Sequence, residues 1–189
     1  MRRLQSQSAP MNFDAFQQSI VSPTLAALAA HWDSVRGQRA MPAWHQLQPS
    51  RIATVLPIIW VYKYDRVTEQ FTGRLAGDRI ARNFGKNFRG IGLEEVHPPA
   101  SLPYVYAGMM RGVMEPSLYH SRGRLFRQRE RVVRGERIFL PLSEDGIHSD
   151  GLIGASDYQH PVLDPHYGPV EILGEGERWF PLETDTVAA

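Results

Sequence analysis

Apolar residues in the first forty positions recur at the spacing of an amphipathic helix. Its apolar face consists of Leu25, Leu28, Ala29, Trp32 and Val35 or Arg36, and the candidate dimer contacts on it are Leu25, Leu28 and Trp32. Ser22 can cap the N-terminus and Gly37 can end the helix, so we expect a helix over 22–36. Its apolar face has to pack against the chain's own domain or against a second copy of the chain. We expect the second arrangement, a homodimer with this helix at its interface.

Two apolar segments further along predict the first strands of a sheet. Residues 58–64 read IIWVYKY, and residues 71–77 read FTGRLAG. β-branched and aromatic side chains favour strands, and the few polar residues between the segments suit a hairpin. A short helix around 49–55, bounded by prolines, is expected to precede them.

Glycine and proline divide the middle of the chain into helices. Asp78 and Gly85 mark the start and the end of a short helix, since a carboxylate suits a helix N-terminus and glycine suits the left-handed cap. A single turn is expected over 91–98. The longest helix is expected from Pro103 to Met114.

The last third of the chain predicts three strands joined by hairpins. Their ranges are 117–126, 130–143 and 151–160. Gly135 and the pair Asp145-Gly146 are the expected turn signals. The order of elements indicates an α+β fold: a five-stranded antiparallel sheet with helices on one face, preceded by an N-terminal helix.

The same order divides the 189 residues into three parts. Residues 1–40 form an N-terminal extension with the amphipathic helix, and residues 41–161 form the folded domain. Residues 162–189 form an acidic tail. Because this tail is rich in proline, glycine and carboxylates, we expect it to be irregular.

Residues 71–90, FTGRLAGDRIARNFGKNFRG, combine glycines with basic side chains. Such a stretch can hold a phosphate, because glycine lets backbone N–H groups approach an anion closely. The spacing matches neither a P-loop nor a dinucleotide fingerprint, since Gly85-Lys86 is followed by Asn87 where a P-loop needs Ser or Thr. We therefore interpret these glycines as turns and helix caps.

Composition excludes several kinds of chemistry. The chain has no cysteine, which excludes disulfides, thiolate metal sites and cysteine nucleophiles. Two arginines near the N-terminus precede no apolar run, so neither a signal peptide nor a membrane span is predicted. Cytoplasmic residence without a membrane partner is the expectation.

The net charge of +1 hides an uneven distribution. Residues 1–143 contain 20 Lys and Arg against 10 Asp and Glu, whereas residues 144–189 contain 1 against 10. We expect the acidic end to fold back and neutralise the basic part. The alternative is an anionic partner, nucleic acid or an acidic protein, bound by arginines on one strand face: Arg127, Arg129 and Arg131.

Two clusters of polar residues raise the further alternative of a metal-dependent or serine hydrolase. The first consists of Asp157, His160, Asp164 and His166, whose spacing fits neither a helix face nor a zinc ribbon. The second consists of Ser143, Asp145 and His148, without the G-x-S-x-G turn of a serine nucleophile. We expect no metal and no catalytic residue, and interpret the second cluster as hairpin-turn residues.

Three segments of the chain resemble the PAS-like sensor domains. They are WHQLQPSRIATVLPIIWVY, FTGRLAGDRIARNFGKNFRGIGLEEV and GERIFLPLSEDGIHSDGLIGA. Together they span most of the chain, and it is especially similar to a bacterial subfamily of mostly standalone PAS proteins once catalogued as a domain of unknown function. The resemblance implies a PAS fold whose sheet and helices enclose a small-molecule pocket, and a role in sensing or in protein contacts.

The resemblance also bears on cofactors. Heme-binding PAS proteins often use a histidine on the central helices, and the helix expected at 103–114 has none, although His97 and His120 flank it. Flavin photoreceptors of this family use a cysteine, which this chain lacks. We therefore expect neither heme nor covalently bound flavin, and any ligand is an unidentified small molecule.

The favoured function is that of a non-enzymatic sensory or regulatory module that binds a small molecule or a protein partner. Candidate pocket residues come from the strands and the long helix: Ile59, Val61, Arg74, Tyr104, Tyr106, Met110 and Leu140. Arg74 is the informative member of this set, because an arginine that faces an apolar cavity needs a paired anion.

Overall fold

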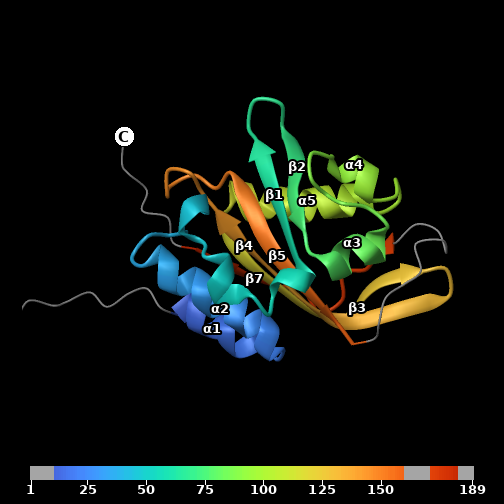
Figure 1. Cartoon of the computed structure of the whole chain (residues 1–189), viewed down its shortest axis with the longest axis horizontal. Helices are drawn as coiled ribbons and strands as arrows, with labels where there is room; N and C mark the ends of the chain where they lie inside the picture. The colour runs from blue at the N-terminus through green and yellow to red at the C-terminus, as the bar shows by residue number, and fades with distance from the viewer. Residues whose placement is uncertain (1–10, 160–170, 183–189) are drawn as a thin grey trace, which may run out of the picture.

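An antiparallel sheet lies at the centre of the structure, a computed structural model that describes residues 11–159 and 171–182 (Figure 1). The strands are β1 (Ile59–Asp65), β2 (Gln70–Ala76), β3 (Ser117–Gln128), β4 (Arg131–Leu142), β5 (Gly151–Tyr158), β6 (Glu171–Ile172) and β7 (Arg178–Pro181). Their order is β2-β1-β5-β4-β3-β6, and β7 also pairs with β3. The early and late groups of predicted strands therefore meet where β1 pairs with β5.

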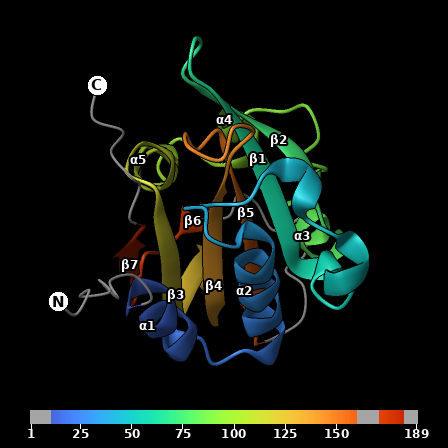
Figure 2. The same cartoon turned by 90° about the vertical axis from the view of Figure 1, so that its left-hand side faces the viewer.

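Helices cover both faces of this sheet, whereas the sequence predicted helices on one face (Figures 1 and 2). The α1–α2 face carries α1 (Met11–Ser19) and α2 (Pro23–Arg36). The α3–α5 face carries α3 (Asp78–Phe84), α4 (Leu93–Val96) and α5 (Leu102–Met114). The 3-10 turns η1 (Trp44–Gln46), η2 (Pro49–Ile52) and η3 (Leu56–Ile58) lead from α2 into β1. None of the described helices is long and apolar enough to cross a membrane.

The local signals that predicted α2 and α3 are present in the structure. The Ser22 hydroxyl accepts a hydrogen bond from the N–H of Leu25, with an N···O distance of 3.4 Å. Gly85 ends α3 with a left-handed backbone (φ 67°), which glycine adopts without strain. The sequence did not predict α1, because a helix of nine residues has little stability of its own. Its position depends on two buried anchors, Phe13 and Phe16.

The core of the α1–α2 face is closed by tight packing. The α2 side chains in it are Leu25, Leu28, Ala29 and Trp32, all without exposed surface. They pack on alternate strand residues such as Ile138 and Leu140. The indole Nε1 of Trp32 donates a hydrogen bond to the carbonyl of Pro141 at 2.9 Å, so the ring is buried with its polar atom satisfied.

A buried carboxylate fastens the start of α2 to the sheet. Glu136 of β4 accepts hydrogen bonds from the backbone N–H groups of Val21 (2.8 Å) and Ser22 (2.6 Å), and its Oε1 lies 2.7 Å from Nε2 of His120. Burial would raise the pKa of Glu136, but the hydrogen bonds from His120, Val21 and Ser22 outweigh burial and lower it. The carboxylate therefore stays charged and holds the chain entering α2.

Two expectations for the C-terminal third are corrected by the strand pairing. Gly135 lies within β4, opposite Tyr158, and the β3–β4 turn falls at Arg129 and Glu130, where Arg129 has a φ of 52°. Part of the tail that was expected to be irregular forms β6 and β7. These strands cover the edge of β3, whose unpaired N–H and C=O groups would otherwise face solvent.

Candidate functional site

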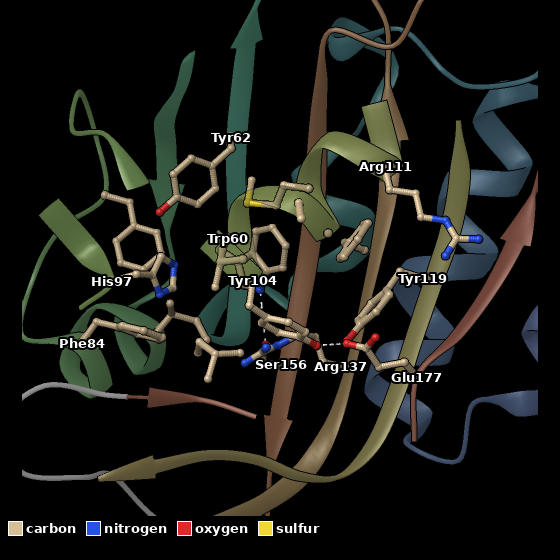
Figure 3. A pocket seen from close by; sticks show the side chains of 18 of the residues that line it. Trp60, Tyr62, Phe84, His97, Tyr104, Arg111, Tyr119, Arg137, Ser156 and Glu177 are labelled. Carbon is tan, nitrogen blue, oxygen red and sulfur yellow. Dashed lines mark hydrogen bonds between the residues drawn. The ribbon is translucent and has the colours of Figure 1, made fainter. Parts of the chain in front are cut away.

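A cavity of about 290 Å³ lies between the sheet and the helices α3 and α5 (Figure 3). Its walls are mostly aromatic and aliphatic, and the C-terminal segment contributes Ile172, Glu177 and Trp179 to one side. Small-molecule sites span roughly 300–1,000 Å³, so this cavity is just below the lower limit of that range. Its size suits a ligand of one or two rings.

Side-chain alternation along the strands determines which residues reach the cavity. The residues of β1, β3, β4 and β5 that line it are Trp60 and Tyr62 of β1, Tyr119 of β3, Arg137 and Phe139 of β4, and Ser156 and Tyr158 of β5. Intervening residues such as Val61 and Ile138 pack on the α1–α2 face. Gly154 of β5 makes room for the Trp60 indole, since a Cβ there would lie 2.2 Å from that ring.

Arg137 extends from β4 toward the cavity and is held by a serine. Its Nε donates a hydrogen bond to the Ser156 hydroxyl at 3.0 Å, and the indole Nε1 of Trp60 donates to the same oxygen at 3.3 Å. Figure 3 shows Arg137 and Ser156 side by side at the cavity. Within the described residues, no carboxylate lies within 4.0 Å of the Arg137 guanidinium, which is half-buried.

His97 follows α4 and borders the same cavity. Its side chain is 8% exposed, and its ring meets that of Phe84 edge-on at 5.6 Å between centroids. Burial, and then the charge of Arg137, lower the pKa of His97 to about 3, so the imidazole is neutral near pH 7. Its Nδ1 is buried without a hydrogen-bond partner in the described part of the chain. Buried polar atoms usually have a partner, so this nitrogen is a candidate ligand contact.

Two tyrosine hydroxyls at the cavity also lack a hydrogen-bond partner among the described residues. Tyr62 and Tyr158 are 2% and 6% exposed, and their hydroxyl oxygens are buried with no partner among the residues described. Burial, and then the charge of Glu94, raise the pKa of Tyr62, so its hydroxyl keeps its proton. With His97, these side chains present three polar atoms that a ligand or an ordered water can satisfy.

The C-terminal segment is fastened to the cavity by a glutamate. The Tyr119 hydroxyl donates to Oε1 of Glu177 at 2.8 Å, and the Tyr104 hydroxyl donates to the same oxygen (Figure 3). Burial raises the pKa of Glu177. Beside it, the guanidinium of Arg111 lies 4.5 Å from the ring centroid of Trp179. These contacts join the segment before β7 to α5 and β3.

The structure corrects the predicted pocket residues on the strands. Ile59, Val61 and Leu140 belong to the core of the α1–α2 face and do not line this cavity. Each is one position away from a residue that points inward, and a shift of one residue places a side chain on the opposite face of a sheet. Tyr104, predicted from the long helix, does line the cavity.

The other three predicted pocket residues, Arg74, Tyr106 and Met110, do not line the cavity. Arg74 is exposed, and its guanidinium lies 5.9 Å from the ring centroid of Trp44, so it points outward and needs no ligand anion. Tyr106 and Met110 pack against the core of the α3–α5 face without lining the cavity. The Tyr106 hydroxyl instead donates to the carbonyl of Glu69 at 2.9 Å.

The residues predicted to form a dimer interface instead pack inside their own chain. Leu25, Leu28 and Trp32 have no exposed surface and pack against the chain's own sheet. The apolar face of the helix therefore packs on its own domain, which was the alternative to a dimer interface. The three side chains therefore present no apolar surface to a second copy.

The predicted arginine stripe is interrupted by a turn. Its members are Arg127 in β3, Arg129 in the β3–β4 turn and Arg131 at the start of β4. They therefore do not share one strand face. Arg127 pairs with Glu171 at 2.6 Å, and Arg124 pairs with Glu175 at 3.2 Å. These pairs confirm that the acidic end folds back and neutralises part of the basic segment.

Ser143, Asp145 and His148 form a hydrogen-bonded loop. Ser143 donates to Oδ1 of Asp145 at 2.7 Å, while Nδ1 of His148 lies 2.9 Å from Oδ2, so the carboxylate separates serine from imidazole. Hydrogen bonds, first that from the His148 side chain, lower the pKa of Asp145. The loop lacks the serine-to-histidine contact that a nucleophile needs.

The predicted histidine–carboxylate cluster lies largely outside the described residues, which do not include His160, Asp164 and His166. Asp157, its described member, accepts a hydrogen bond from the Ser22 hydroxyl at 2.6 Å. Within 11–159 and 171–182, no group of three or more His, Asp or Glu side chains is arranged to hold a metal ion.

Sequence reasoning did not select Arg137, His97 or Ser156 as site residues. The local sequence contained little signal for Arg137, a charged residue directly before the continuous apolar run IFLPL. Such a run does not say which face of the strand borders a cavity. His97 carried a weaker signal through its position beside the helices.

Comparison with known proteins agrees with this architecture. The profile of the PAS domain family matches residues 20–156, well over half of the chain, and the match includes α2. The chain therefore belongs to the PAS domain family, whose members are generally sensory or regulatory modules. No curated protein and no solved structure gives a significant match.

Proposed function

We propose that this protein is a sensory or regulatory PAS module that binds a small molecule in the cavity between the sheet, α3 and α5. One observation carries the proposal: three buried polar atoms without partners in the described chain, on His97, Tyr62 and Tyr158, lie around one aromatic cavity. Each such atom costs about 1–3 kcal/mol when it stays unsatisfied. A ligand that contacts these atoms would remove that cost, which supports a binding function.

The proposed role is non-enzymatic, and it involves neither heme nor covalently bound flavin. The chain has no cysteine for a flavin adduct. A cavity of about 290 Å³ suits one or two rings, whereas heme is a macrocycle of four pyrrole rings. A Soret band in the spectrum of the purified protein would contradict this part of the proposal.

Homodimerisation is a separate part of the proposal, and it requires a surface other than Leu25, Leu28 and Trp32. Light scattering of the full chain over a range of concentrations tests it, and a constant monomer mass would remove it. A nucleic-acid partner is not proposed, because Arg127 of the basic run is paired with Glu171.

Gly108 offers a direct test of binding in the cavity. It lines the cavity from α5, and a Cβ built on it has no atom within 4 Å. Gly108→Leu is therefore expected to add a side chain in the cavity from a Cβ in open space, while leucine supports the helix. Gly108→Ala is the matched control, with the same helical benefit and little added volume.

Native mass spectrometry of freshly purified protein supplies the readout. We expect wild type and Gly108→Ala to carry a non-covalent small molecule that is released on denaturation, and Gly108→Leu to lack it while it melts at the same or a higher temperature. Equal occupancy in Gly108→Leu would show that the ligand binds elsewhere.

A further inference from the structure

Among the described residues, two arginines border the cavity, and they differ in the contacts that they make. Arg111 stacks on Trp179, and its side chain is 47% exposed, with Glu115 3.9 Å away. Arg137 has no carboxylate within 4.0 Å among the described residues, and the hydrogen bond that it makes comes from Nε. A guanidinium beside apolar walls is unfavourable unless an anion pairs with it.

Ser156 holds Arg137 in one direction. Ser156 has no exposed surface, and its hydroxyl accepts from both Arg137 Nε and Trp60 Nε1. Because Nε is occupied, the two Nη groups are the donors left for a ligand. They can bind a carboxylate through two parallel hydrogen bonds. The serine fixes the arginine beforehand, which reduces the entropy lost on binding.

Flat rings line the same cavity as Arg137. Phe139 stacks on Tyr119 with 4.4 Å between centroids and 9° between planes, and Trp60 lies 6.0 Å from Phe139. Such walls favour a flat, apolar ligand body. We infer that the ligand is a small aromatic carboxylate, with its carboxylate on the Nη groups of Arg137 and its ring among Trp60, Tyr119 and Phe139. This inference rests on the proposed binding function.

The position of Glu177, whose carboxylate lines the cavity, is consistent with this orientation of the ligand. Oε1 of Glu177 accepts from Tyr119 and Tyr104, and the group lies beyond salt-bridge distance from Arg137. An anion beside Glu177 would be repelled, so the ligand carboxylate belongs at the Ser156 side of the cavity. The unpartnered atoms of His97, Tyr62 and Tyr158 can then bind polar substituents on the ring.

Calorimetric titration of the full chain tests the inference with three acid–amide pairs. The probes are benzoate, phenylacetate and indole-3-acetate, each beside its neutral amide, against wild type and Arg137→Gln. The matched control is Arg134→Gln, an exposed arginine of the same strand. Hydrogen bonds to charged groups predict that at least one acid binds about ten- to a hundredfold more tightly than its amide. Arg137→Gln should abolish that preference, and Arg134→Gln should keep it.

The outcomes separate this inference from the proposed function. Amides that bind as tightly as their acids overturn the carboxylate assignment while the cavity keeps its binding role. An acid preference that survives Arg137→Gln overturns the role of Arg137. If no probe binds and native mass spectrometry finds no ligand, both the inference and the proposed function fail. Unchanged amide affinity in Arg137→Gln shows that the variant cavity is intact.

Discussion

The two faces of one sheet in this protein are built from different kinds of side chain. On the α1–α2 face, aliphatic residues pack around Trp32, whose polar atom is paired with Pro141, and Glu136 accepts three hydrogen bonds. On the α3–α5 face, aromatic rings leave a cavity of about 290 Å³ that is lined by Arg137, His97, Tyr62 and Tyr158. The same strands supply both faces because their side chains alternate.

This difference separates stability from binding. A filled core stabilises the fold through dispersion and burial, and an unfilled one forgoes part of that stabilisation. We therefore expect substitutions on the α1–α2 face to lower stability most. Substitutions on the α3–α5 face should change ligand affinity at smaller cost to the fold.

The largest expected effect comes from a pair of tryptophans, one on each face. Trp32→Ala should reduce the free energy of unfolding by about 3–5 kcal/mol, because it removes a side chain with no exposed surface. Trp179→Ala should cost clearly less, since Trp179 is half-buried and already borders the cavity. Urea denaturation measures both values, and equal losses would break the comparison between the faces.

An effect of intermediate size is expected from His97 in acid. Its folded pKa of about 3 lies below the ordinary value of 6.5, so between these values the unfolded chain binds a proton that the folded chain does not. Stability is therefore lost as the pH falls from 6.5 toward 3, by about 2 kcal/mol at pH 5. His97→Phe should remove this loss and keep the contact with Phe84.

Denaturation at pH 7 and pH 5 measures the effect of His97→Phe. His45→Gln, at an exposed histidine, is the control and should keep the acid sensitivity of wild type. If His97→Phe loses as much stability on acidification as wild type does, His97 is not a buried neutral group in solution.

The smallest expected effect distinguishes two glycines on α5. Gly108→Ala should raise the free energy of unfolding by about 0.5–1 kcal/mol, because alanine favours the helix and its methyl group enters open space. Gly112→Ala should lower it, since a Cβ there would lie 2.7 Å from the ring of Phe139. Thermal unfolding reports both signs, and a gain at Gly112 would mean that the α5–sheet contact is looser than described.

Much of the fold could be predicted from local pattern. The caps of α2 and α3, the helix after Pro103 and the two groups of strands were all correctly placed, because short-range signals determine these elements. The residues of the site were mostly not found. Ile59 and Leu140 were chosen in place of Trp60 and Phe139, since strand alternation gives two faces without saying which one borders the cavity.

Arg74, which the sequence suggested for the cavity, and Arg137, which borders it, show the same limit. Arg74 and Arg137 both sit in strands beside apolar residues, and nothing local distinguishes them. Arg74 lies on the strand β2 at the end of the sheet order and points outward, whereas Arg137 lies on β4 within the sheet and reaches the cavity. Their difference arises from strand order, which depends on contacts between distant segments.

The sequence by itself determined α2, α3, α5, the strands β1 to β5, the α+β class and the absence of cysteine chemistry, since each depends on residue type and short-range spacing. Only the tertiary structure decided that α2 closes one face, that β6 and β7 cover the edge of β3, and that Arg137 borders the cavity. Those outcomes depend on which faces of distant segments meet when the chain packs, and one residue of register exchanges the two faces of a strand.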